Sequence, residues 1–183
     1  MVFSSNLRSA LERNIVVGTS GCGKTTFARR LAETLQAPHV ELDRLFWLPG
    51  WQPRQVEAFR GLVEPSVSGT RWVVDGNYGM LRDVIWPRAT HAIWLNYSFP
   101  LVIAQVTRRT LANIAARREV FPGCRETLRN SFLSRKSVIW WSITTFRRRQ
   151  HRYAAMRRER AFPQLTWVEL RSRLEARMFW ESL

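Results

Sequence analysis

Gly18-Thr19-Ser20-Gly21-Cys22-Gly23-Lys24-Thr25 is the stretch that decides the fold of this chain. It matches the pattern G-x-x-x-x-G-K-S/T at every fixed position. Glycines allow consecutive backbone N–H groups to turn inward and bind an anion, and a following helix points its positive end at the same place. The stretch therefore predicts a phosphate-binding loop, and we expect its eight residues and the next one, Thr26, to contact a nucleotide.

Two side chains of this loop have individual expected roles. Lys24 is expected to reach the β- and γ-phosphates of ATP, and the Thr25 hydroxyl is expected to bind Mg²⁺. Lys24 is one of two lysines among 29 basic residues. A compact point charge in an arginine-rich chain favours a working loop over a chance glycine-rich turn. Cys22 fills a variable position, although a helix N-terminus lowers the pKa of a thiol and makes a reactive cysteine the alternative.

Short apolar runs alternate with helical periodicity on both sides of the loop. After a helical or frayed lead-in, the expected strands cover 14–18, 39–42, 71–75, 91–95 and 166–170. The expected helices cover 25–35, 56–63, 101–118, about 125–157, and the chain from about 172. Short buried strands separated by helices are typical of a parallel sheet covered on both faces. The sequence predicts an α/β fold in one domain, 1–183.

Composition narrows the protein classes. The chain of 183 residues is 45% hydrophobic, yet no run approaches the roughly 18 apolar residues that a membrane helix needs. We therefore expect a soluble cytoplasmic protein without a signal peptide or a membrane partner. Two cysteines argue against a disulfide framework, and the three histidines show no metal-ligand spacing, so we expect no zinc site.

Positive charge is concentrated in the second half of the chain. Residues 1–100 carry 11 basic and 8 acidic side chains, whereas residues 101–183 carry 18 and 6. Such a field attracts polyanions but does not choose among nucleotides, nucleic acids and anionic membranes. A nucleic-acid-associated ATPase, or a nucleotide-binding regulatory protein, is therefore the alternative. A nucleic-acid partner is not favoured, because the sequence contains no recognisable nucleic-acid-binding module.

Further blocks occur at characteristic separations: Asp43-Arg44-Leu45-Phe46-Trp47, Pro49-Gly50-Trp51, Asp75-Gly76-Asn77-Tyr78 and Phe146-Arg147-Arg148-Arg149. With the loop, they resemble the adenylate-kinase-like P-loop proteins labelled topology modulation (FlaR-related) proteins, over about residues 14–175. The resemblance implies a three-layer P-loop NTPase fold with a five-stranded sheet in the order 2-3-1-4-5. It also implies an acceptor-site insert at about 43–66 and a lid-like helical region at about 108–135.

The same resemblance implies an activity. It points to an ATP- and Mg²⁺-dependent phosphotransferase, a kinase that acts on a nucleotide or another small acceptor as a monomer or homodimer. Nothing in the sequence identifies the acceptor. ATPase activity is an additional expectation.

Two acidic residues follow expected strands. Asp75 would emerge at the carboxyl edge of the sheet beside the phosphate loop, where an acid holds Mg²⁺ or its waters. The alternative is a turn with Gly76 and Asn77. Asp43 would end the second strand at the same edge, and we expect it to orient the acceptor or to act as general base. Its alternative role is a helix N-cap.

Aromatic and basic side chains complete the expected site. The resemblance places the acceptor site at Asp43, Arg44, Trp47, Trp51, Gly76, Asn77 and Tyr78, and aromatic rings with an arginine suit stacking on a planar base. Core packing is the alternative for each tryptophan. Arginines of the lid-like region are expected to bind the nucleotide (Arg108, Arg109) and to stabilise transition-state charge (Arg117, Arg118). A solvated face is the alternative for any of them, and more so for Arg147 to Arg149.

Overall fold

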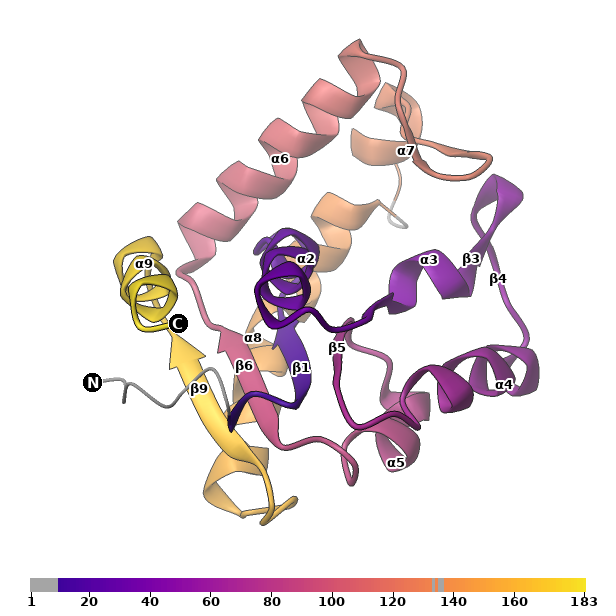
Figure 1. Cartoon of the computed structure of the whole chain (residues 1–183). Helices are drawn as coiled ribbons and strands as arrows, with labels where there is room; N and C mark the ends of the chain where they lie inside the picture. The colour runs from indigo at the N-terminus through magenta and orange to yellow at the C-terminus, as the bar shows by residue number, and fades with distance from the viewer. Residues whose placement is uncertain (1–9, 133, 135–136) are drawn as a thin grey trace.

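Five parallel strands form the central sheet of the described residues, which are 10–132, 134 and 137–183 of this computed structural model (Figure 1). They are β1 (Arg13–Gly18), β2 (His39–Glu41), β5 (Trp72–Asp75), β6 (His91–Leu95) and β9 (Thr166–Leu170). The order across the sheet is β2-β5-β1-β6-β9, and all neighbours are parallel. Counting only these sheet strands, the order is 2-3-1-4-5, so the predicted α/β class and topology are confirmed.

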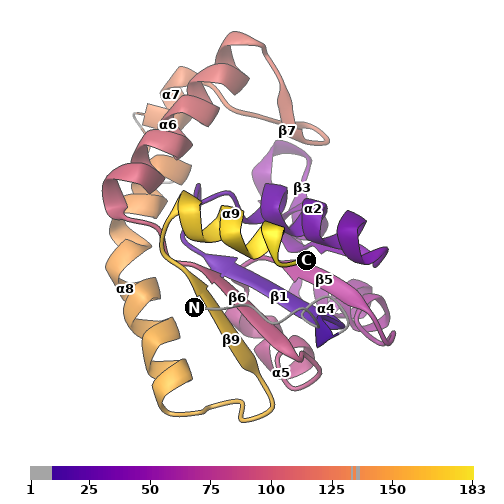
Figure 2. The same ribbon diagram turned by 60° about the vertical axis from the view of Figure 1, so that its left-hand side comes forward.

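Helices cover both faces of the sheet, and the strand residues alternate between them. In β1, Ile15 and Val17 pack on one face and Val16 on the other. The first face is covered by α4 (Val56–Ser66), α5 (Arg82–Ile85) and the C-terminal half of α8 (Val138–Arg158). The second face is covered by α2 (Lys24–Leu35), α9 (Arg173–Glu181) and the start of α6 (Phe99–Ala115) (Figure 2). Burial on both faces explains why the strands are continuous apolar runs.

Most predicted boundaries agree with the structure within a few residues. The strands predicted at 91–95 and 166–170 agree at both ends, and the helix predicted at 25–35 begins one residue earlier. The terminal helix starts after Ser172, whose Oγ accepts a hydrogen bond from the backbone N of Glu175 at 3.1 Å. Of the lead-in expected before residue 14, residues 1–9 lie outside the described residues.

The helix predicted over about 125–157 is wrong. The described residues form α7 (Leu128–Phe132) and then α8, which begins after Ser137 because the Ser137 Oγ accepts from the backbone N of Trp140 at 3.1 Å. Before α7 lies a short antiparallel hairpin of β7 (Glu119–Phe121) and β8 (Cys124–Arg125). Gly123 makes its turn with a φ of +70°.

The insert after β2 also departs from expectation. The strand predicted at 39–42 ends at Glu41, because Leu42 begins the short helix α3 (Leu42–Phe46). Asp43 therefore lies in the first turn of a helix and not at the end of a strand, and Glu41 occupies the N-cap position. A second antiparallel hairpin follows, formed by β3 (Trp47–Leu48), the 3-10 turn η1 (Pro49–Trp51) and β4 (Gln52–Pro53).

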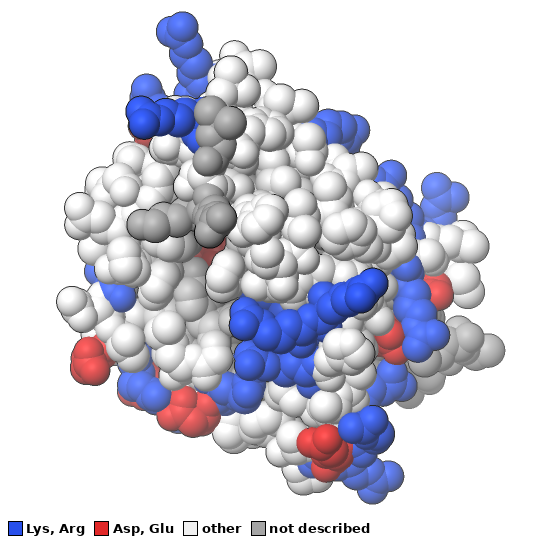
Figure 3. All heavy atoms as spheres, turned by 180° about the vertical axis from the view of Figure 1, so that it is seen from behind, with Lys and Arg blue, Asp and Glu red and all other residues white. Residues whose placement is uncertain are grey.

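The longest described helix, α8, is strongly basic on its exposed side. Its 21 residues include six arginines. Phe146, Tyr153 and Met156 face the sheet and are buried. Figure 3 views the molecule from behind, the side on which α8 lies in Figure 1, and shows a band of basic side chains. None of the described helices has both the length and the apolar character that a membrane crossing requires.

We expect Phe59→Ala to destabilise the chain by about 3–5 kcal/mol, because it empties a fully buried position. Phe59 of α4 is 0% exposed, and its ring centroid lies 5.1 Å from that of Phe46 and 5.0 Å from that of Tyr78. Urea unfolding measures the change. Leu62→Ala on the same helix is the control, since Leu62 is 41% exposed and should cost less than about 1 kcal/mol. Equal losses in the two variants would contradict this account.

Candidate nucleotide and acceptor site

The loop between β1 and α2 has a backbone that only small residues tolerate. Gly21 and Gly23 have φ values of +86° and +92°, which side chains rarely allow. A Cβ added to Gly21 would lie 2.5 Å from the Cβ of Val106 on α6. Backbone conformation and close packing against α6 therefore both require glycine in this loop.

Lys24, Thr25 and Asp75 meet at the carboxyl edge of the sheet. The Lys24 Nζ donates to the backbone oxygen of Thr19 at 3.1 Å, so the amine bends back over the loop. The Thr25 Oγ1 donates to the Asp75 Oδ2 at 2.7 Å. β5 pairs with β1 so that Asp75 lies opposite Val16, just before the loop. Three residues expected to act on the phosphates and the metal are thus adjacent.

Acidic side chains at this edge repel one another. Asp75 is buried, and its Oδ1 lies 2.8 Å from His39 Nε2. Glu41 ends the neighbouring β2, and burial, followed by the charge of Asp75, raises its pKa. Glu41 and His39 are not among the site residues expected from the sequence. The sequence feature that could have identified them is their place on the predicted second strand. That strand, β2, runs beside β5, which ends at Asp75.

The donor set at this edge suits Mg²⁺ held jointly by protein and substrate. Mg²⁺ is usually bound by one or two carboxylates, while phosphates and waters complete its coordination. Thr25 and Asp75 offer a hydroxyl and a carboxylate that are already in contact. Within the part of the chain that the structure describes, no three His, Cys, Asp or Glu side chains are placed to hold a metal by themselves. The residues present therefore fit a metal that arrives with a nucleotide.

Asp43 and Tyr78 form a second polar pair, on the acceptor side. The Tyr78 hydroxyl donates to the Asp43 Oδ1 at 2.6 Å. Burial, followed by the charge of Asp43, raises the pKa of Tyr78 far above its ordinary value. Tyr78 therefore stays protonated, and its hydrogen bond holds the Asp43 carboxylate in place.

Asn77 connects the phosphate loop to α8. Its Nδ2 donates to the backbone oxygen of Gly18 at 2.7 Å, and its Oδ1 accepts from the Tyr153 hydroxyl at 2.7 Å. Both ends of the amide are thus engaged with the protein, which makes Asn77 a support for the loop. Gly76 precedes it and lies against Leu42, where an added Cβ would come within 2.8 Å of the Leu42 Cβ.

Trp51 joins the β3–β4 hairpin to the β7–β8 hairpin, and in Figure 1 the two lie side by side. Its Nε1 donates to the backbone oxygen of Arg125 at 3.1 Å. Its ring centroid lies 5.8 Å from that of Trp47 and 6.0 Å from that of Phe121. The predicted acceptor-site tryptophans therefore pack in the contact between the insert and the lid-like region. Arg44 is exposed.

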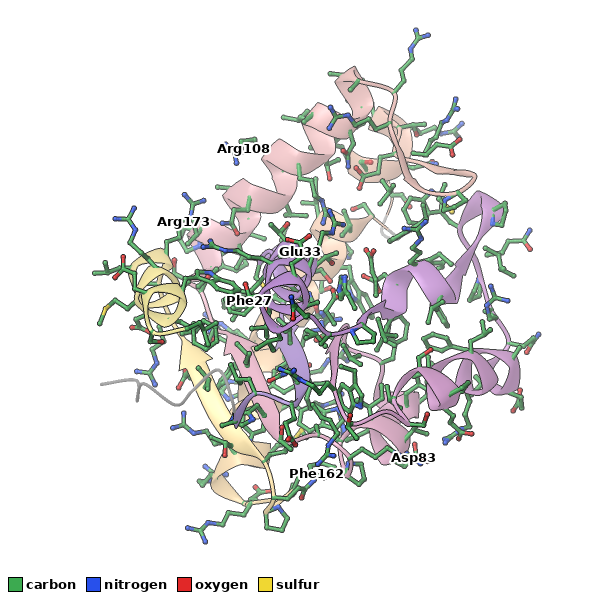
Figure 4. All side chains as sticks on the ribbon, in the orientation of Figure 1. Phe27, Glu33, Asp83, Arg108, Phe162 and Arg173 are labelled. Atoms are coloured by element: carbon green, nitrogen blue, oxygen red, sulfur yellow. The ribbon has the colours of Figure 1, made fainter. Side chains whose placement is uncertain are left out.

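The four arginines expected to serve the nucleotide do not contact the phosphate loop in this structure. Arg108 and Arg109 are exposed on α6, and Figure 4 shows Arg108 pointing outward from that helix. Arg117 and Arg118 follow the far end of α6, which points away from α2 in Figures 1 and 2. All four side chains are therefore solvated here.

A different arginine, Arg149 of α8, reaches the loop. Its Nη1 donates to the Ser20 Oγ at 3.3 Å, and the neighbouring Ser142 Oγ donates to the Ser20 backbone oxygen at 3.0 Å. Burial lowers the pKa of Arg149. From the sequence, a solvated face is the favoured interpretation of the whole run 147–149. Helical spacing could have distinguished Arg149 from its neighbours. Arg149 is three residues after buried Phe146 and four before buried Tyr153, so the three lie on one face of the helix.

Cys22 is a packing residue of the loop. Its side chain is 2% exposed, and burial raises the pKa of its thiol. The reactive-thiolate alternative is therefore not supported by its surroundings. Thr26, in the first turn of α2, is exposed.

Comparisons with known proteins agree with this geometry at the level of the fold. No protein-family model and no curated protein sequence matches the chain. It is similar to a solved gluconokinase from Sinorhizobium meliloti 1021, with a TM-score of 0.53 and 17% identity over 95% of this chain and 90% of that one. It is also similar to a shikimate kinase from Bacteroides thetaiotaomicron, with a TM-score of 0.51 and 14% identity over 93% of this chain and 94% of that one.

These identities establish the fold alone. Both similar structures are kinases, and both are matched over nearly their whole length. The chain therefore has a P-loop kinase-like fold, and the phosphate loop with Asp75 lies at the edge of the sheet where such folds bind ligands.

We expect Glu41→Gln to raise stability at pH 7. The folded-state pKa of Glu41 lies above its ordinary value of 4.5, so ionisation at higher pH destabilises the folded chain. The gain should shrink as the pH falls toward 4.5, where the carboxyl becomes protonated in the folded and unfolded states alike. Thermal unfolding of both proteins between about pH 4.5 and 8 measures it.

Glu57→Gln is the matched control for this measurement. Glu57 is exposed on α4, so its substitution should leave the stability at pH 7 within about 0.5 kcal/mol of wild type. A Glu41→Gln protein that is less stable than wild type at every pH would show that the carboxylate is stabilising and would contradict the prediction.

Proposed function

We propose that this protein is an ATP- and Mg²⁺-dependent phosphotransferase of the adenylate-kinase-like type, acting on a nucleotide or another small acceptor. The observation that carries the proposal is the 2.7 Å hydrogen bond from Thr25 to Asp75 beside Lys24. It brings together the hydroxyl, acid and amine with which P-loop enzymes bind a nucleotide and its metal. Two similar structures are a gluconokinase and a shikimate kinase, which favours a small-molecule acceptor.

Within this class, the sequence blocks around Asp43, Trp51 and Asp75 support a place among the topology modulation (FlaR-related) proteins. Those blocks form the acceptor side of the site, where Tyr78 meets Asp43 and Trp51 closes against the β7–β8 hairpin. A phosphate loop is shared by many enzymes, whereas the acceptor side distinguishes one kinase family from another. The family proposal therefore depends on these residues.

Each group of residues has a defined task in the proposed reaction. The loop N–H groups and Lys24 bind the β- and γ-phosphates, and Thr25 and Asp75 would hold Mg²⁺. When bound, the metal neutralises phosphate charge. Arg149, seated beside Ser20, supplies a fixed positive donor for charge on the transferred group.

Asp43 is the proposed general base. The acceptor oxygen forms a bond to the γ-phosphorus while the bond from that phosphorus to the β–γ bridging oxygen breaks, so ADP leaves. The proton of the acceptor hydroxyl passes to Asp43, which the Tyr78 hydroxyl holds at 2.6 Å.

Nucleic acid stays the alternative partner. Arg147 and Arg148 of α8 are exposed, and Figure 3 shows a band of basic side chains on the side of the molecule where α8 lies. A field of this kind attracts any polyanion and carries no selectivity by itself. Arg149, in contrast, already lies at a phosphate loop, which is why we favour a small-molecule reaction.

We expect Lys24→Ala to weaken ATP·Mg²⁺ binding at least about tenfold and to abolish turnover, because it removes a charge-assisted contact to the terminal phosphates. Isothermal titration calorimetry and ATP turnover measure the two effects, and circular dichroism checks the fold. Arg177→Ala removes one positive charge from an exposed position of α9 and serves as the control. Unchanged ATP affinity and turnover in Lys24→Ala would exclude the proposed nucleotide site.

A second test concerns the acceptor. For an acceptor that reacts through a hydroxyl, found by a screen with labelled ATP that starts with nucleoside monophosphates, we expect Asp43→Asn to lower kcat by about 10²–10⁴-fold. ATP affinity should change little, because Asp43 lies outside the phosphate loop. Tyr78→Phe should lower kcat less, since it removes only the hydrogen bond that positions Asp43. Wild-type kcat in Asp43→Asn would assign Asp43 to structure and not to proton transfer.

A further inference from the structure

A narrow cavity lies between α3, the turn after β5, α5 and α8. Arg82 of α5 and Arg149 and Arg152 of α8 line it, together with Tyr78. Its volume is about 30 Å³, which is room for one or two water molecules. Among the described residues that line it, none is an aspartate or a glutamate. Its walls therefore carry three positive charges, and the nearby acid, Asp43, lies behind the Tyr78 hydroxyl that donates to it.

Arg82 has a donor that the protein does not use. Its Nε is buried and has no hydrogen-bond partner among residues 10–132, 134 and 137–183. The guanidinium carbon lies 5.8 Å from the ring centroid of Trp86, and this contact with the ring gives the Nε–H no hydrogen-bond acceptor. A buried donor without an acceptor costs free energy, and the cost is larger for a charged group.

Arg149 contributes a second guanidinium with spare donors. It is half-buried, and its hydrogen bond to the Ser20 Oγ uses only one of its five N–H groups. Elsewhere on α8 the chain supplies an acid for an arginine: Arg157 Nη1 lies 2.8 Å from the Glu169 Oε2. No ion pair joins Arg82, Arg149 or the exposed Arg152 to an acid within the described part of the chain, so these guanidinium groups have donors free for an oxyanion in the cavity.

We propose that this cavity binds the anionic group, a carboxylate or a phosphate, of the phosphoryl acceptor. The proposal rests on the phosphotransferase function proposed above, because it names the chemical class of that acceptor. Planar guanidinium forks match the oxygens of carboxylates and phosphates. The small volume suits the charged end of a ligand and not a ring, so the rest of the acceptor lies outside the cavity.

The position of the cavity relates this anion site to the chemistry. Tyr78 forms part of its wall and donates to Asp43, while Arg149 forms another part and donates to Ser20 of the phosphate loop. A ligand anchored here therefore has the proposed base and the phosphate loop as its nearest functional neighbours. Arg149 would contact the anchored acceptor and the transferred phosphoryl group together.

The proposal predicts that the enzyme prefers anionic acceptors to neutral ones, which similarity of fold does not predict. A site built to pair with a charged group rejects an analogue that lacks it, because its buried donors are then left unpaired. Acceptors with a carboxylate or phosphate should therefore exceed their neutral counterparts in kcat/KM by about 100-fold or more. Glucose 6-phosphate against glucose, and glucuronate against glucose, are pairs that keep hydroxyl groups able to react and differ in the anion, so the screen compares a phosphate and a carboxylate with the same neutral sugar.

The decisive experiment reads anion binding directly and needs no known acceptor. Wild type is saturated with Mg²⁺ and the non-hydrolysable analogue AMP-PNP, which occupies the phosphate loop, and inorganic phosphate and then acetate are titrated by calorimetry. We expect one bound oxyanion per chain. Arg82→Gln and Arg152→Gln should each weaken its binding by about tenfold or more, since each removes a charged donor. Arg88→Gln, at an exposed position six residues after Arg82, should leave it unchanged.

The outcomes separate this proposal from the one on which it rests. Binding of phosphate alone indicates a phosphorylated acceptor, and binding of acetate indicates a carboxylate; both support the site. If AMP-PNP binds but neither anion does, or if both arginine variants bind the anion like wild type, the anion site is overturned and the nucleotide site stands.

If AMP-PNP does not bind, the proposed function fails. In that case, phosphate is titrated into Lys24→Ala without nucleotide, which still measures anion binding in the cavity. Loss of phosphate binding in the double variant Lys24→Ala/Arg82→Gln would support the anion site.

Discussion

The hydrogen bond from Thr25 to Asp75 joins the start of α2 to the end of β5, and the geometry of the site depends on it. β1 and β5 are neighbours in the sheet, so residues 50 positions apart become adjacent at one edge. The parallel arrangement is essential, because only parallel strands bring their carboxyl ends to the same edge. Val16 lies opposite Asp75, and the phosphate loop follows within two residues.

α8 provides the second support of the site. Through Ser142, Arg149 and Tyr153 it contacts Ser20 of the loop and Asn77 of the turn after β5. These contacts satisfy half-buried polar groups of the loop and the turn, which makes the loop conformation dependent on a helix more than 100 residues away. A displacement of α8 would therefore change the loop, the turn and the arginine-lined cavity together.

Several parts of this architecture could be predicted from local sequence. The loop motif, the apolar strands and the helix at 25–35 depend on neighbouring residues, and the structure agrees with them within one residue. The errors lie where a short element depends on distant contacts. The β3–β4 and β7–β8 hairpins are too short to show periodicity, and they meet through the bond from Gly50 N to Gly123 O at 3.0 Å.

Arg149 shows the difference between pattern and placement. Arg147, Arg148 and Arg149 are chemically identical, and only the orientation of α8 decides which of them faces the loop. By itself, the sequence determined the phosphate loop, the strand order implied by its resemblance, and the acid that follows the third sheet strand. The tertiary structure alone decided which arginine serves the loop and that three arginines share a cavity without an acid. The physical reason is that local backbone preferences act over a few residues, whereas charge compensation depends on side chains that folding brings together.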